Sequence, residues 1–242
     1  MVKVYSSNFI FSVLWLFYSF GFLVLVNQIK ILLFLISNRF SMYPKLSSTL
    51  AKIVLDKISK KRKEVLKILI HYVKEKLAVN QEPLLNFICT HNSRRSQLSQ
   101  IWAQTAAYYY NINVRCFSGG LEVTAFNEAA VASLKRSGFK VKGIGKINPK
   151  YNVYYAQESK PIIAFSKLYS DKVNPSESFA SIITCDHADE NCPFIPYSEK
   201  RILLRYNDPK IYDNTVLEEK KYDERSFQIA SEMLYVFKKV KD

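Results

Sequence analysis

The sequence has little glycine, little cysteine and few acidic residues. Six glycines in 242 residues exclude collagen-like and glycine-rich low-complexity proteins, and four cysteines exclude a small domain stapled by disulfides. Only 21 acidic residues face 35 lysines and arginines, a formal net charge of +14. This excess points to an anionic partner such as nucleic acid, a membrane or a phosphate-like substrate. The chain has no recognised nucleic-acid-binding motif, so we expect no nucleic-acid partner.

Hydrophobic residues make up 48% of the chain, enough for a buried core, but they are unevenly distributed. Residues 1–41 contain no acidic residue, and residues 9–26 carry no charge. That stretch is close to the roughly 20 residues that span a bilayer. Lys30 and Arg39 follow it, so a spanning helix would leave the rest of the chain in the cytosol. Residues 1–41 are therefore either a membrane anchor or an extension upstream of a start at Met42; either way we expect a cytoplasmic protein.

The remaining chain consists of a helical extension and an α/β domain. Apolar stripes at helical spacing run through residues 42–83 and end at Pro83. From residue 84 to residue 242, short apolar runs alternate with helical patterns. We expect strands at 84–88, 114–117, 162–165, 179–184 and 202–206, helices at 96–110, 126–136 and 222–239, and mainly loop at 143–160. This alternation is typical of an α/β fold in which a parallel sheet has helices on both faces.

The first strand and the first helix of this domain are joined by a short loop that carries the chemistry. It runs from Cys89 through Thr90, His91, Asn92, Ser93 and Arg94 to Arg95, and Ser96 follows it. Backbone N–H groups of such a loop can surround one tetrahedral oxyanion, and the helix N-terminus adds positive potential that favours a thiolate at Cys89. Arg95 offers a planar fork to two oxygens, and Ser96 can donate to the thiolate. The alternative is a buried cysteine beside two exposed arginines.

This loop, followed by Gln97 and Trp102, resembles the phosphate loop of low-molecular-weight protein tyrosine phosphatases and of the thioredoxin-coupled arsenate reductases that share their fold. Three further segments match: Phe117-Ser118-Gly119-Gly120 resembles the second-strand motif, Asp208-Pro209 the Asp-Pro of the general acid, and residues 185–193 the two-cysteine segment of the reductases. The resemblance covers about residues 84–242 and implies the low-molecular-weight phosphatase fold. Two positions depart from it: His91 replaces a glycine, where we expect a backbone that is either strained or differently turned, and Arg94 replaces a cysteine and adds charge near the anion.

The resemblance implies an arsenate reductase that uses a relay of thiols. Cys89 attacks arsenate while Asp208 protonates the departing oxygen. Cys185 then attacks the sulfur of Cys89 and releases arsenite, Cys192 attacks Cys185, and thioredoxin reduces the resulting disulfide. Arg95 binds the oxyanion. The implied role is arsenic detoxification, with thioredoxin as electron donor and no resident cofactor or metal.

Several alternatives stay open. The same loop suits a phosphatase that hydrolyses phosphomonoesters through a phosphocysteine, or a non-catalytic oxyanion- or phosphoprotein-binding module. Cys185 and Cys192 could be unused thiols, a structural disulfide or, with His187, zinc ligands, and Asp208 could be a turn residue. Some arsenate reductases bind potassium; Asn92 and Ser118 match that site, but Gln100 stands at an acidic position and argues against the ion. We expect Cys116 in the core and His71 on the surface.

Overall fold

The structure, a computed structural model, describes residues 42–191 and 194–242. Residues Met42–Asp242 form one compact unit. The proposed anchor at 9–26 and the second relay cysteine, Cys192, lie outside the described residues. Within the described ranges, no helix combines the length and apolar character needed to cross a membrane.

The described chain alternates between strands and helices, as the pattern from residue 84 onward predicts. In chain order, the elements are α2 (Pro44–Ala51), η1 (Leu55–Lys57), α3 (Lys60–Ala78), β1 (Leu84–Cys89), α4 (Arg95–Tyr109), β2 (Arg115–Gly120), α5 (Glu128–Ser137), β3 (Lys140–Ile144), β4 (Lys150–Tyr154), β5 (Ile162–Ala164), β6 (Phe179–Ile183), α6 (Asp186–Asn191), β7 (Ser198–Leu203), η2 (Pro209–Tyr212) and α7 (Glu218–Lys241).

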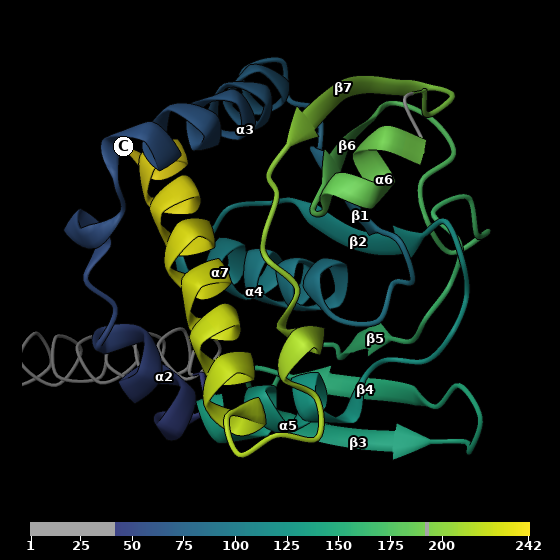
Figure 1. Cartoon of the computed structure of the whole chain (residues 1–242). Helices are drawn as coiled ribbons and strands as arrows, with labels where there is room; N and C mark the ends of the chain where they lie inside the picture. Colours follow the sequence, from purple (N-terminus) through teal and green to yellow (C-terminus); the bar gives the residue numbers. More distant parts are fainter. Residues whose placement is uncertain (1–41, 192–193) are drawn as a thin grey trace, which may run out of the picture. The chain divides into compact units, whose positions relative to one another are not determined.

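A four-stranded parallel sheet in the order β2-β1-β6-β7 lies between α4 and α6 (Figure 1). Side chains alternate between its two faces. Leu85 and Phe87 enter the main hydrophobic core, where α4 packs on β1 and β2 and α7 packs on α4. Ile88 and Ile183 belong to a second cluster on the other face, which includes Ala188 of α6. The predicted parallel sheet with helices on both faces is therefore confirmed.

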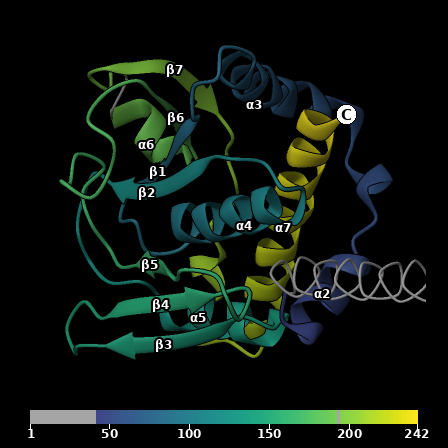
Figure 2. The same cartoon turned by 180° about the vertical axis from the view of Figure 1, so that it is seen from behind.

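A second, antiparallel sheet in the order β3-β4-β5 was not predicted (Figure 2). We expected loop with at most a short strand at residues 143–160, because Gly143, Gly145 and Pro149 interrupt that stretch. The hairpin of β3 and β4 forms nevertheless, and β3 is exposed at four of its five residues. Its outer positions need no apolar side chains, so the period-two pattern that marks a half-buried strand is missing. Similarly, β7 covers residues 198–203 instead of 202–206. Its early residues Glu199 and Lys200 are exposed and charged, so they do not show the apolar pattern of a buried strand.

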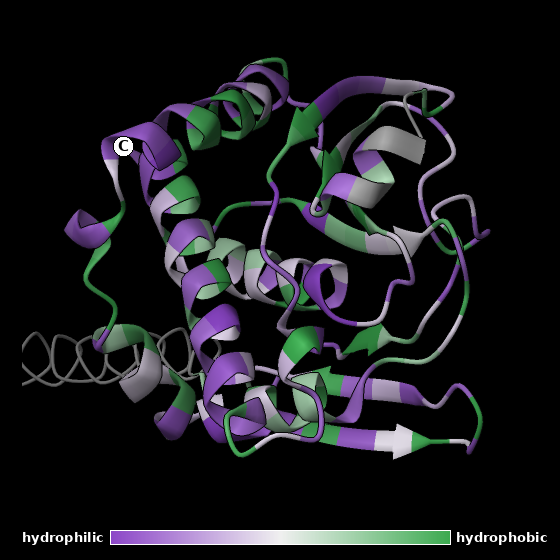
Figure 3. Cartoon of the chain, viewed as in Figure 1, coloured by the Kyte–Doolittle hydropathy of each residue, from purple (hydrophilic) through white to green (hydrophobic). Residues whose placement is uncertain are grey.

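Helices α2 and α3, which precede the predicted domain, pack into the same core as the sheet. Leu46, Leu66 and Leu69 are fully buried there. Helix α3 starts after Ser59, whose hydroxyl accepts from the N–H of Arg62 and caps the first turn. It packs against α7, which alternates between polar and apolar segments along its length, as a helix with one buried face does (Figure 3).

Candidate active site

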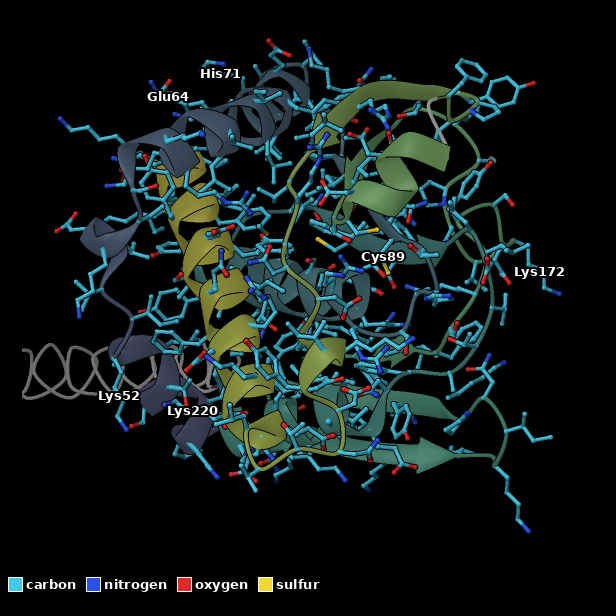
Figure 4. All side chains as sticks on the ribbon, in the orientation of Figure 1. Lys52, Glu64, His71, Cys89, Lys172 and Lys220 are labelled. Carbon is cyan, nitrogen blue, oxygen red and sulfur yellow. The ribbon has the colours of Figure 1, made fainter. Side chains whose placement is uncertain are left out.

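Cys89 is the last residue of β1 and is 3% exposed, at the carboxyl end of the parallel sheet (Figure 4). Its Sγ lies 3.0 Å from the Oγ of Ser96, in the first turn of α4. Asn92 Nδ2 donates to that same Oγ at 2.8 Å. Because the Ser96 oxygen already accepts from Asn92, its own hydrogen is available to the sulfur. Ser96 is therefore placed to hydrogen-bond the sulfur of Cys89.

The loop between Cys89 and Arg95 turns its carbonyl groups outward. The Thr90 carbonyl accepts from the N–H groups of Leu121 and Glu122 at 2.7 and 2.9 Å. The His91 carbonyl accepts from Ser166 Oγ at 2.8 Å, and the Ser93 carbonyl from the N–H of Asn127 at 3.0 Å. By contrast, the backbone N–H groups of residues 91–95 donate to no group in the described ranges. With the N-terminus of α4 beside them, these N–H groups form a site for an anion.

Asn92 gives the loop its sharp turn. Its φ is +47°, in the left-handed region that asparagine tolerates better than most residues, whereas His91 has an ordinary negative φ. Of the two alternatives at His91, the backbone is therefore differently turned, and the left-handed residue is Asn92. The fully buried Asn92 side chain fixes the turn, because its Oδ1 accepts from the backbone N–H of Lys167 and from Gln97 Nε2, both at 3.1 Å.

Gly120 allows the backbone of β2 to approach this loop closely. A Cβ at position 120 would lie 2.7 Å from the Asn92 nitrogen and 2.7 Å from the Thr90 carbonyl oxygen. In Gly119, a Cβ would lie 2.2 Å from the Cα of Tyr169. Both contacts are with backbone atoms and cannot be relieved by a side-chain rotation. The predicted second-strand motif thus acts as a support against which the loop packs.

Arg95 and Asp208 are brought together at the mouth of the loop. Arg95 Nη1 donates to the Tyr206 carbonyl at 3.1 Å, and its Nη2 pairs with Asp208 Oδ2 at 2.6 Å. The buried Nε of Arg95 has no hydrogen-bond partner in the described chain. Asp208 Oδ1 accepts from the N–H of Lys210 at 3.0 Å and caps η2. Asp208 is therefore a turn residue whose carboxyl group also contacts the loop arginine.

Arg94 is held at the rim of the loop. Its Nη2 pairs with Asp213 at 2.5 Å and its Nε donates to the hydroxyl of Tyr222, on α7. Tyr222 in turn donates to Asp213 at 2.6 Å, and burial is the main cause that raises the pKa of this tyrosine. The positive charge of Arg94, which we expected to act on the bound anion, is thus shared with Asp213. Nothing in the local sequence indicated this contact, because Asp213 is 119 residues away.

Cys185 lies beside the same loop. It follows β6, the parallel neighbour of β1, and is 1% exposed. Its Sγ is 3.5 Å from Thr90 Oγ1 and accepts from the N–H of Ala188 at 3.4 Å. Cys89 and Cys185 belong to one apolar cluster, and both are free thiols. Cys192 directly follows α6 in sequence. Among the described residues, no three potential ligands are grouped to hold a metal ion.

The residues at the expected potassium site do not fit that ion. Gln100 Oε1 accepts from Ser118 Oγ at 2.6 Å, and its Nε2 donates to the Cys116 carbonyl at 3.1 Å. Asn92 Oδ1 already accepts two hydrogen bonds. The side-chain amide of Gln100 therefore completes this network with neutral hydrogen bonds, whereas a carboxylate at this position would need a cation to balance its charge. As expected, Cys116 is buried, which raises its pKa, and His71 is exposed (Figure 4).

Sequence reasoning missed a buried network behind Arg95. Both carboxylate oxygens of Glu232, on α7, accept from Arg62 of α3, at 2.9 and 2.8 Å. Glu232 also accepts from the hydroxyl of Tyr206 at 2.8 Å, and the Tyr206 carbonyl is the one that receives Arg95. Burial, and then the charge of Glu232, raise the pKa of Tyr206 well above its ordinary value. Because 170 residues separate Arg62 from Glu232, no local pattern could predict this contact.

Comparison with known proteins connects this geometry with one group of enzymes. No protein-family profile matches the chain. The arsenate reductase of Brevibacillus brevis is 27% identical over 123 residues, which cover 51% of this chain and 74% of that protein. Arsenate reductase 2 of Staphylococcus haemolyticus is also 27% identical over 123 residues, with coverage of 51% and 76%. A solved YwlE mutant from Bacillus subtilis has a TM-score of 0.46 and 14% identity, and covers 66% of this chain and all of that one.

The structure brings together the residues on which the loop resemblance rests. A thiol at the end of a central parallel strand, a loop of free N–H groups and an arginine at the start of the next helix are the features that the loop resemblance implied. The chain is thus similar in sequence to arsenate reductases, and its loop from Cys89 to Arg95 resembles the phosphate loop of the low-molecular-weight protein tyrosine phosphatase superfamily.

Proposed function

We propose that the protein is a thioredoxin-dependent arsenate reductase in which Cys89, Cys185 and Cys192 act in sequence. The observation that carries the proposal is the position of Cys185. Its sulfur touches Thr90, the first residue after the nucleophile, and shares an apolar cluster with Cys89. A phosphatase needs no second thiol there, whereas a reductase needs one to take over two electrons.

The first step transfers arsenate to Cys89. The free N–H groups of residues 91–95 and the unpartnered Nε of Arg95 bind the arsenate oxygens. The Cys89 thiolate attacks arsenic and forms an S–As bond. One arsenic–oxygen bond breaks, and its oxygen leaves as water after taking a proton from Asp208. For this role Asp208 must exchange its ion pair with Arg95 for a proton, and the bound oxyanion, which competes for the same guanidinium, favours that exchange.

The second step reduces arsenic. The Cys185 thiolate attacks Cys89 Sγ and forms a disulfide, and the electron pair of the broken S–As bond leaves with arsenic as arsenite. Cys192 then attacks Cys185 Sγ, which frees the Cys89 thiolate and leaves a disulfide between Cys185 and Cys192. A dithiol of thioredoxin reduces that disulfide and is itself oxidised. The cycle therefore requires a reducing compartment such as the cytosol.

The test is arsenate-dependent oxidation of NADPH in the presence of thioredoxin and thioredoxin reductase. We expect turnover in the full chain and in Cys116→Ala, whose thiol lies in the core away from the loop. Turnover should be lost in Cys89→Ser, Cys185→Ser and Cys192→Ser. Activity that persists in both Cys185→Ser and Cys192→Ser would contradict the relay.

A cavity beside the loop favours a second candidate, hydrolysis of a phosphate monoester through a phosphocysteine. This cavity of about 390 Å³ is lined by His91, Ser93, Arg94, Phe126 and Lys210, among others. Arsenate has no organic leaving group, but a phosphomonoester does, and the cavity could accommodate it. Hydrolysis of para-nitrophenyl phosphate that is lost in Cys89→Ser but retained in Cys185→Ser and Cys192→Ser supports this candidate. If Cys89→Ser changes neither activity, the site only binds oxyanions.

A further inference from the structure

A second cavity, of about 580 Å³, lies between β2, α4 and β5, away from the mouth of the anion loop. These elements are neighbours in both views of the fold (Figures 1 and 2). Its volume is in the range of sites for small organic molecules. Apolar side chains, including Phe117, Ile162 and Phe165, form much of its wall. Four cationic residues and no carboxylate line it: Arg115, Lys150, Lys160 and Lys167.

Lys167 is the buried member of this set. It is 3% exposed, although lysine is almost never buried without a counterion. Its Nζ makes one hydrogen bond within the described ranges, at 3.4 Å to the Phe165 carbonyl, and lies 4.8 Å from the centre of the Phe165 ring. No described carboxylate lies within ion-pairing distance of this Nζ. An ammonium group has three N–H donors, so two of them remain without a protein acceptor.

The other three cations contribute less to the electrostatics of the cavity than Lys167 does. Lys150 lies 5.0 Å from the centre of the same Phe165 ring, and Lys160 is exposed at the rim. Arg115 pairs with Glu82 at 2.6 Å, so its charge is already compensated. Lys167 therefore dominates the inner part of the cavity. Burial lowers its pKa to about 8, which a nearby anion would reverse, while Asp171 raises it only in part.

The wall of this cavity also supports the anion loop. The backbone N–H of Lys167 donates to Asn92 Oδ1 at 3.1 Å, and the Phe165 carbonyl accepts from Gln97 Nε2 at 2.7 Å. Gln97 also donates to the Asn92 carbonyl at 3.1 Å. A molecule in the cavity would thus contact the residues that hold Asn92 in its left-handed conformation.

We propose that this cavity is a second ligand site, separate from Cys89, that binds a small organic carboxylate with an apolar body and pairs its carboxylate with the Lys167 ammonium. The apolar walls would contact the body, and the free N–H donors of Lys167 would bind the oxygens. The combination of one buried cation with aromatic walls suits an amphiphilic monoanion better than a free inorganic oxyanion, which would leave those walls without a contact.

The test uses 2-naphthoate as the probe and 2-naphthamide as its uncharged counterpart, with affinities measured by calorimetry on the full chain. We expect naphthoate to bind at least about tenfold more tightly than naphthamide, since the amide cannot form the charge-assisted pair. Lys167→Met should lose about tenfold or more of the naphthoate affinity, and Lys167→Arg should retain most of it. Lys172→Met is the matched control, because Lys172 is an exposed lysine near the same loop that does not line the cavity (Figure 4).

Binding must also persist in Cys89→Ser, and arsenate must not compete with naphthoate for one site. Equal affinities for naphthoate and naphthamide, or unchanged naphthoate affinity in Lys167→Met, would overturn the proposal. Loss of naphthoate binding upon saturation with arsenate would assign the probe to the anion loop and overturn it as well. If Lys167→Met does not fold, Lys167→Arg and the naphthamide comparison still decide, because neither requires removal of the cation.

Discussion

Replacement of Lys167 by methionine should stabilise the protein at neutral pH and remove one source of its pH dependence. Methionine fills a similar volume without a charge, whereas the wild-type chain holds an ammonium group 3% exposed with no carboxylate in ion-pairing distance among the described residues. Burial lowers the pKa of this lysine from 10.5 to about 8. Over the whole titration, that difference is worth on the order of 3 kcal/mol of unfolding free energy.

The direction of this pH dependence follows from the number of protons that the folded and the unfolded chain bind at Lys167. Below about pH 8 both the folded and the unfolded chain carry the proton, so the full destabilisation is present and the slope is zero. Between about pH 8 and 10.5 the unfolded chain still binds a proton that the folded chain has lost, so the wild type gains stability as pH rises. We expect the free energy of unfolding of the wild type to rise by roughly 2 kcal/mol relative to that of Lys167→Met between about pH 7 and pH 10.

Urea unfolding of both proteins at these two pH values measures the effect, because the titration of every other group cancels in the difference. A difference between the proteins that stays constant across this range would refute the reasoning, since it would mean that Lys167 keeps its ordinary pKa in the folded chain.

Three further predictions concern the anion loop, the ion pair between Arg62 and Glu232, and the second cavity. Asp208→Asn should reduce kcat for arsenate by about 10²-fold or more, since no proton reaches the leaving oxygen, and steady-state kinetics equal to those of the wild type would exclude Asp208 as the acid. Arg62→Met should destabilise the chain by about 3 kcal/mol or more, because it leaves the buried carboxylate of Glu232 without its cation; a loss below about 1 kcal/mol in denaturation would contradict that pairing. Naphthoate affinity should fall as pH rises through about 8, where Lys167 loses its proton, and calorimetry should detect proton uptake on binding. The charged and titratable groups around Lys167 are Asp171, Lys150, Lys160, Arg115, Cys116 and Tyr155; an affinity that does not change with pH would argue against Lys167 as the partner.

The sequence was sufficient for those parts of the fold in which neighbours in sequence decide the structure. β1 is apolar at every position except Asn86 because both faces of the sheet are buried, and α5 ends where Gly138 adopts a φ of +107°. The loop from Cys89 to Arg95 was predictable because its function needs a strand before it and a helix after it. The position of Cys185 next to that loop follows from the parallel pairing of β1 with β6, which sequence patterns indicate but do not align.

Other features depend on contacts that no local pattern contains. The strands β3 and β4 are too exposed to show an apolar alternation, so their pairing was missed. Lys167 looked like one surface lysine among many, because burial is decided by the segments that close over it. The left-handed turn at Asn92 was predictable from residue type, since asparagine adopts this conformation more readily than most residues other than glycine.

The pairing of Arg62 with Glu232 has a consequence for how the chain can be shortened. A protein trimmed to begin at residue 84 would match the region of family resemblance, but it would lose the partner of a carboxylate that is 2% exposed and uncover the surface on which Leu66 and Leu69 rest. Of its described partners, the Glu232 carboxylate would then keep the neutral donors Tyr206 and Gln228, and the backbone carbonyl of Tyr206 is an acceptor for Arg95. The helices before residue 84 therefore help to position Arg95, the residue proposed to bind the oxyanion, although they precede it in the sequence.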